Sequence, residues 1–233
     1  MKTDKFYRSC FLTFSLALVV TLLLPSKTFG QEPAASVSTA SETKFRFGIH
    51  ASPNISWIST KDDEVEPSAN VKFGFGLLAI FNFTENYAIS SGINIVSRGG
   101  ELLTEPDPIQ YKGDYASQFL QIPIQLRMST REFGYNTFFA TFGGSVDLRL
   151  SEEINIEPEL PDPLDSYVKF FNAMFIIGAG MEYNLGGNTS VVGGIYYHRS
   201  LIDNLIEDDN HLLVNNSSVY RFDYVSLQLG ILF

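Results

Sequence analysis

The last nine residues, Val225–Phe233, alternate between large apolar side chains and small or polar ones. The apolar positions are Val225, Leu227, Leu229, Ile231 and Phe233, and the residues between them include Ser226, Gln228 and Gly230. Successive side chains of a β-strand point to opposite faces, so the segment predicts a strand with one apolar face and one polar face. The sequence ends on the aromatic side chain of Phe233.

The same alternation recurs in about eight segments. They cover residues 45–57, 71–83, 87–98, 120–128, 137–149, 171–183, 189–200 and 220–233. Their connections alternate between short ones at 82–87, 129–136 and 184–188, and long ones at 59–69, 97–114, 151–166 and 201–218. Strands can cross lipid only in a closed barrel, because every backbone group needs a partner. The pattern predicts an all-β fold, an eight-stranded antiparallel up-and-down transmembrane β-barrel with periplasmic turns and extracellular loops.

The first 30 residues predict a cleavable secretory signal peptide. Lys2, Lys5 and Arg8 precede an apolar stretch over residues 10–24, and small residues follow it before position 31. That layout is typical of a secretion signal, and the stretch is shorter than the ~20 apolar residues of a spanning helix. We expect cleavage after Gly30, a flexible leader over residues 31–43, a barrel domain over residues 44–233, and a location in the cell outer membrane.

The polar strand faces also carry charges, at Arg46, Lys72, Arg98, Arg127, Asp147, Arg149 and Glu182. A soluble barrel turns its apolar face inward, whereas a membrane barrel turns that face to lipid. The first arrangement would make a lipocalin-like carrier, and the second places the charges in the lumen. An eight-stranded barrel is just wide enough for its own side chains. We therefore expect the charges to fill the lumen as ion pairs rather than to line a wide pore.

Acidic residues concentrate in the predicted long loops, and the full chain has a formal net charge of −10. Carboxylates of this kind can bind divalent cations or a basic protein partner, and the metal candidates are Asp62, Asp63, Asp208 and Asp209. A solvated acidic surface is the simpler explanation, and no loop has calcium-site spacing. We expect no metal and no cofactor, and the negative charge argues against nucleic-acid binding.

His198 and Ser200 stand two residues apart and therefore share a strand face. An imidazole so placed can activate a hydroxyl as a nucleophile. The spacing resembles the catalytic strand of outer-membrane lipid A deacylases, but that family has Asn and Ala after the serine where this chain has Leu201 and Ile202. No spacing fixes Glu207 or Asp208 as an orienting acid. We expect a polar pair at the extracellular rim and no enzymatic activity, with a deacylase-like hydrolase as the alternative.

Four further segments carry motifs that can be compared with a known family. They are Phe47–Asn54, Leu120–Leu126, Phe138–Val146 and Ile177–Tyr183. In this order, and with the terminal strand, they resemble the PorT-like outer-membrane β-barrel family of small porin-like proteins in Bacteroidota. The resemblance covers residues 44–233. It implies assembly by the barrel-insertion machinery, which reads the last strand and its terminal aromatic, here Phe233, and it implies no enzymatic activity.

The expected role is structural, surface-interacting or supportive of protein secretion, since some members of that family serve secretion. The expected contacts are outer-membrane lipid, the barrel-assembly machinery and a protein partner at the extracellular loops.

Overall fold

The computed structural model describes residues 44–60, 65–104, 112–157, 168–206 and 219–233, where all regular structure is β-strand. The strands are β1 (Phe45–Ser59), β2 (Val65–Ser68), β3 (Asn70–Asn82), β4 (Tyr87–Thr104), β5 (Lys112–Ser129), β6 (Asn136–Glu157), β7 (Phe171–Gly186), β8 (Thr189–Ser200) and β9 (Arg221–Leu232). No helix in these ranges is long and apolar enough to span a membrane. The predicted signal peptide and leader lie outside the described residues.

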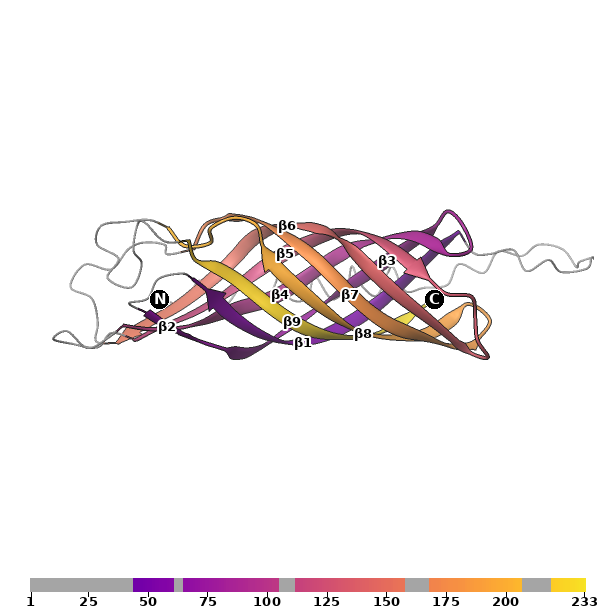
Figure 1. Ribbon diagram of the computed structural model, residues 1–233, viewed down its shortest axis with the longest axis horizontal. Helices are drawn as coiled ribbons and strands as arrows, with labels where there is room; N and C mark the ends of the chain where they lie inside the picture. Colours follow the sequence, from indigo (N-terminus) through magenta and orange to yellow (C-terminus); the bar gives the residue numbers. More distant parts are fainter. Residues whose placement is uncertain (1–43, 61–64, 105–111, 158–167, 207–218) are drawn as a thin grey trace, which may run out of the picture. The chain divides into compact units, whose positions relative to one another are not determined.

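The strands form one antiparallel sheet that closes on itself (Figure 1). Strands β3 to β9 pair in chain order, and β1 closes the ring by pairing with both β3 and β9. β2 and β3 belong to one crossing, because both pair with β4 and only Ala69 separates them. The nine strands therefore make eight crossings, and the predicted eight-stranded antiparallel barrel is confirmed.

The apolar face of the wall points outward. Phe73, Phe75 and Leu77 are 52%, 51% and 55% exposed, whereas Arg127 and Asp147 on the opposite faces of their strands are 4% and 0% exposed. An apolar exterior around a charged interior is the arrangement of a barrel in lipid. The alternative of a soluble carrier is therefore wrong, because its apolar face would have to line the cavity.

Aromatic side chains gather at both ends of this apolar surface. Towards the long loops, Trp57 stacks on Tyr197 with ring centroids 6.5 Å apart. Towards the short turns, Phe83 stacks on Tyr87 at 6.4 Å, and the rings of Tyr135 and Tyr183 lie 6.1 Å apart. Amphipathic rings favour the boundary between lipid and water, so these pairs mark the two interfaces.

The three longest strands extend well beyond the length that lipid requires. β4 and β5 have 18 residues each and β6 has 22, whereas a tilted transmembrane strand needs about 9–11. The loops predicted over residues 97–114 and 151–166 are therefore wrong in their bounds, because β4 continues to Thr104 and β6 to Glu157. The charged residues in these two ranges predict loops. However, the part of a strand that extends beyond the membrane can carry charged side chains on its outer face.

Outside the membrane the polarity of the two faces of the wall is reversed. We call this part the long-loop section: residues 99–104 of β4, 112–118 of β5, 151–157 of β6, and β2. The membrane section is the rest of the wall, which has the apolar exterior. Outer side chains in the long-loop section include Gln118, Ser151, Glu153, Asn155 and Glu157, besides the ion pair of Lys112 with Glu101 at 3.1 Å. Its inner side chains include Leu102, Tyr115, Ile154 and Ile156. The exterior is therefore polar and the interior mainly apolar.

On β6 a bulge produces this exchange. Phe119 lies opposite Arg149, but Gln118 lies opposite Ser151, so Leu150 is an extra residue. One extra residue moves every later side chain to the other face. Odd-numbered positions such as Asp147 therefore point into the lumen below the bulge, and odd-numbered positions such as Glu153 point outward above it.

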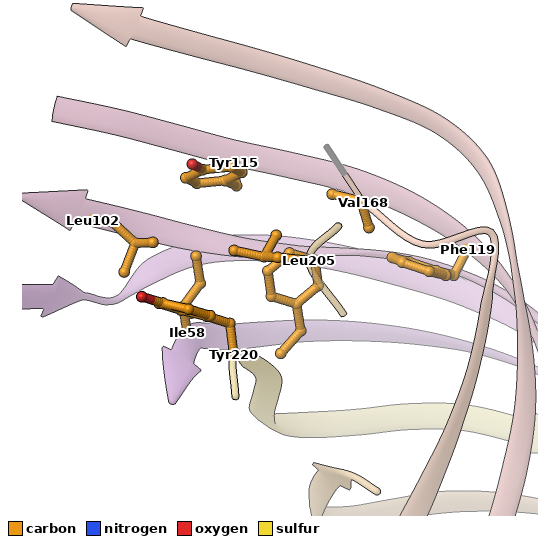
Figure 2. Close-up of a cluster of buried hydrophobic side chains, with 8 residues drawn as sticks. Ile58, Leu102, Tyr115, Phe119, Val168, Leu205 and Tyr220 are labelled. Atoms are coloured by element: carbon orange, nitrogen blue, oxygen red, sulfur yellow. The ribbon is translucent and has the colours of Figure 1, made fainter. Parts of the chain in front are cut away.

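An apolar cluster fills the barrel at its long-loop end (Figure 2). This cap cluster consists of Ile58, Leu102, Tyr115, Phe119, Val168, Leu205, Tyr220 and Phe222, each fully buried. Val168 and Leu205 come from segments that leave the wall and meet across the interior in an isolated β-bridge. The cap cluster is thus a small water-excluding core above the charged lumen.

Candidate functional site

Two arginines share one carboxylate inside the membrane section near the short turns. Arg46 and Arg127 donate to the two oxygens of Glu182 at 2.5 Å and 2.7 Å, respectively. The Arg127 guanidinium also lies 3.9 Å above the ring of Phe139, and Arg46 donates to the Ser190 hydroxyl at 2.9 Å. Because a buried charge is costly unless paired, the cluster links β1, β5 and β7 and fills the lumen between them.

A second ion pair lies deeper in the lumen. Arg98 donates to Asp147 at 2.5 Å, and both side chains are fully buried. Asp147 also accepts a hydrogen bond from Ser145 at 2.6 Å, and Arg98 lies 3.8 Å above the ring of Phe119. The cation–π contact thus connects this pair to the cap cluster.

The remaining predicted lumen charges lie nearer the long loops. Arg149 pairs with Glu152 and donates to the backbone carbonyl of Val168. Lys72 is half-buried on the inner face opposite Asn54, and it has no carboxylate partner among the described residues. The structure thus places Arg46, Lys72, Arg127, Asp147, Arg149 and Glu182 on the inner face of the wall.

Between the two buried ion-pair clusters, polar side chains surround a cavity of about 40 Å³. Its lining includes His50, Asn94, Gln121, His198 and Tyr224. His50 Nε2 lies 2.9 Å from Asn94 Oδ1, and Gln121 donates to the Tyr224 hydroxyl at 3.0 Å. A polar space of this size has room for about three water molecules, so it is too small for a larger solute.

His198 and Ser200 share the inner face, as their spacing predicts, but each bonds to other groups. His198 Nε2 lies 3.2 Å from the Ser226 hydroxyl, and the imidazole stacks on Tyr224 at 4.0 Å. The Ser200 hydroxyl oxygen lies 2.8 Å from Asn172 Oδ1 and 2.8 Å from the carbonyl oxygen of Ile202, and its single proton is donated to one of these two acceptors. The acids Glu207 and Asp208 lie outside the described residues. Both side chains therefore belong to the hydrogen-bonded packing of the lumen.

Phe233 lies where the barrel closes. Its side chain is 53% exposed on the apolar exterior, and its backbone N–H donates to the carbonyl of Phe47 at 2.6 Å. The metal candidates Asp62, Asp63, Asp208 and Asp209 lie outside the described residues. Within the described ranges, no group of three or more His, Cys, Asp or Glu side chains could hold a metal ion.

The sequence matches a known family over most of its length. Residues 29–206 match the family described as "Outer membrane protein beta-barrel domain". The chain belongs to this family. Its location in the outer membrane follows from that membership together with the exposed apolar wall. In such barrels the long loops are extracellular and the short turns periplasmic, so the long-loop section stands outside the cell.

Several solved structures of outer-membrane proteins are similar to this chain at low sequence identity. The outer-membrane protein OprG from Pseudomonas aeruginosa is similar, with a TM-score of 0.51, 10% identity, and coverage of 80% of this chain and 95% of that chain. Neisserial surface protein A has a TM-score of 0.46, 11% identity and coverage of 80% and 95%. Ail, the attachment invasion locus protein of Yersinia pestis, has a TM-score of 0.39, 13% identity and coverage of 81% and 98%. No curated protein matches the sequence significantly.

Proposed function

We propose that this outer-membrane barrel is a closed anchor that presents the long-loop section for interaction at the cell surface. The observation that carries the proposal is the filled interior. Two buried ion-pair clusters and the cap cluster occupy the lumen in succession along its axis. The long-loop section, in contrast, carries a polar exterior well beyond the lipid. A partner can therefore reach this part of the barrel from the extracellular medium.

Closure of the lumen is testable by conductance. The purified protein, inserted into a planar lipid bilayer, is expected to show no steady channel current. Stable single-channel openings of the unmodified protein would contradict a closed anchor.

The interaction role is testable by site-specific photo-crosslinking in intact cells. A photoreactive residue at Asn155, exposed in the long-loop section, is compared with one at Glu85, exposed in a periplasmic turn. Surface interaction predicts a crosslinked macromolecule at Asn155 and none at Glu85. A product only at Glu85 would instead favour support of secretion from the periplasmic side. Absence of a product at both sites would leave only a structural role in the membrane.

We further propose that the barrel is not an enzyme. The separate hydrogen bonds of His198 and Ser200 support this, since a nucleophile needs its base within hydrogen-bonding reach. Expression of the wild type and of Ser200→Ala is expected to leave lipid A acylation identical to that of cells lacking the protein. Loss of an acyl chain with the wild type, but not with Ser200→Ala, would establish the deacylase alternative.

We also propose that the chain belongs to the PorT-like branch of the family and that it reaches the membrane through a cleaved signal peptide. The motifs Phe47–Asn54 and Leu120–Leu126 support a place in the PorT-like branch. Secretion through a cleaved signal predicts that the mature protein begins at Gln31. Recognition of Phe233 by the assembly machinery predicts that Phe233→Ser lowers the fraction of folded barrel, which migrates differently in heated and unheated gel samples.

A further inference from the structure

β6 carries an open backbone edge outside the membrane. It pairs with β5 up to Glu157, but with β7 only up to Leu148, which lies opposite Phe171. The last backbone contact on the β7 side is the Arg149 N–H to the Phe170 carbonyl at 2.8 Å. Val168 then turns into the interior to meet Leu205. The edge Leu150–Glu157 thus has no second strand among the described residues.

The opposite side of the long-loop section ends on the short strand β2, which has four residues. There, β2 pairs with β4 from Val65 to Ser68, so the β4 edge has a partner. Unpaired N–H and C=O groups on an extended strand form a template for another strand. Many recognition domains bind an extended peptide in this way, and side chains at alternate positions set the specificity.

The two faces beside this edge differ in chemistry. The outer face carries Glu153 and Glu157 with Ser151 and Asn155, all exposed. On the inner face Glu152 is paired with Arg149, whereas Ile154 and Ile156 are half-buried and pack against the cap cluster. An added strand would place one set of side chains beside carboxylates and the other set beside an apolar core.

We propose that the edge Leu150–Glu157 binds an extended peptide segment with alternating basic and apolar residues as an additional strand. Basic side chains would face Glu153 and Glu157, and apolar ones would extend the cap cluster over Ile154 and Ile156. A second copy of the chain fits worse, because like charges directly opposite each other destabilise a strand pair. This inference rests on the surface-interaction role and names the chemistry of its partner.

Peptide binding to the full-length mature protein tests the proposal. The protein is held in phosphatidylcholine nanodiscs, and the probe is a short fluorescent peptide of alternating lysine and valine. We expect saturable binding that weakens as salt rises, measured by fluorescence anisotropy. Peptides alternating glutamate with valine, or lysine with serine, are expected to bind at least about tenfold more weakly, since each loses one of the two complementary faces.

A charge-reversal variant locates the binding site. Glu153→Lys combined with Glu157→Lys is expected to weaken binding of the lysine–valine peptide about tenfold, because two attractions become repulsions. The matched control is Glu85→Lys with Glu132→Lys, which changes the net charge equally at exposed periplasmic positions. This control is expected to bind as the wild type does. The heated and unheated gel positions establish that both variants are folded.

The backbone contribution is tested separately. The same lysine–valine peptide with every second backbone amide methylated keeps its charge but cannot pair along one edge. We expect it not to bind, and we expect hydrogen exchange over residues 151–157 to slow only with the unmethylated peptide. Equal binding of the methylated peptide, or no binding of either, would overturn strand addition. Crosslinking at Asn155 would still decide the surface-interaction role on its own.

Discussion

The membrane section and the long-loop section are parts of one continuous wall with opposite polarity. On β5, Ile122 and Ile124 face outward opposite the inward Gln121 and Gln125, whereas further along the same strand Gln118 faces outward and Tyr115 inward. The antiparallel pairing of β5 with β4 and with β6 continues through both parts. The comparison shows that alternation sets which residues share a face, and that the surrounding solvent sets which face is apolar.

The two sections therefore depend on different interactions. Apolar side chains that face lipid gain little from the hydrophobic effect, because acyl chains are equally apolar. The membrane section is thus fixed internally by buried ion pairs such as Arg98 with Asp147. The long-loop section stands in water, where burial of the cap cluster supplies the driving force.

Breaking the central ion pair should have the largest effect. Asp147→Ala leaves Arg98 buried without its carboxylate, and we expect a loss of about 3–5 kcal/mol in the free energy of unfolding. Urea unfolding in lipid vesicles, followed by Trp57 fluorescence, measures it. The double variant Arg98→Met, Asp147→Leu removes both charges and is expected to lose less. A single variant as stable as the wild type would show that the pair does not hold the membrane section.

Truncating a side chain of the cap cluster should have the second-largest effect on stability. Leu205 is fully buried there, and Leu205→Ala is expected to cost about 2–5 kcal/mol through lost burial and a residual cavity. The damage should be local, with faster hydrogen exchange in residues 112–118 and 151–157 and unchanged exchange in the membrane section. Uniformly faster exchange throughout the barrel would contradict the independence of the two sections.

Introducing an arginine on the exterior of each section compares the surroundings of the two outer surfaces. Leu77→Arg places a charge on the lipid-facing wall of the membrane section, and we expect it to cost about 2–4 kcal/mol. Asn155→Arg on the exposed exterior of the long-loop section should change stability by less than about 0.5 kcal/mol. Urea unfolding in vesicles compares the two directly. Similar costs for both would mean that residue 155 also faces lipid.

The smallest effect is expected at the boundary between the sections. Trp57→Ala removes the ring that stacks on Tyr197, and such a pair is worth about 0.5–1.5 kcal/mol beyond its buried area. The unheated gel band after graded urea treatment measures the loss without the tryptophan signal. Ser59→Ala, one strand position further on the same face, serves as the control and is expected to match the wild type.

The sequence predicted the membrane section well. Period-two alternation over residues 71–83 and 120–128 fixed the faces of those strands, and charges at Arg127 and Glu182 stood on the polar face. It predicted ion pairs in the lumen but not which charges pair, because Arg98 and Asp147 lie on different strands and come together only when the barrel closes. Likewise, His198 and Ser200 share a face, but Ser226 and Asn172, their actual partners, are distant in sequence.

The sequence predicts loops where the long-loop section has strands, and the difference has a physical reason. Residues 151–157 combine carboxylates with isoleucines, and the bulge at Leu150 breaks the register that alternation depends on. By itself the sequence determined eight crossings and one apolar face on each, because local spacing decides which side chains share a strand face. Only the tertiary structure decided where the wall leaves the lipid, which strands extend beyond it and which edge stays open. These features depend on pairing between residues far apart in the chain and on segments that fold back into the lumen.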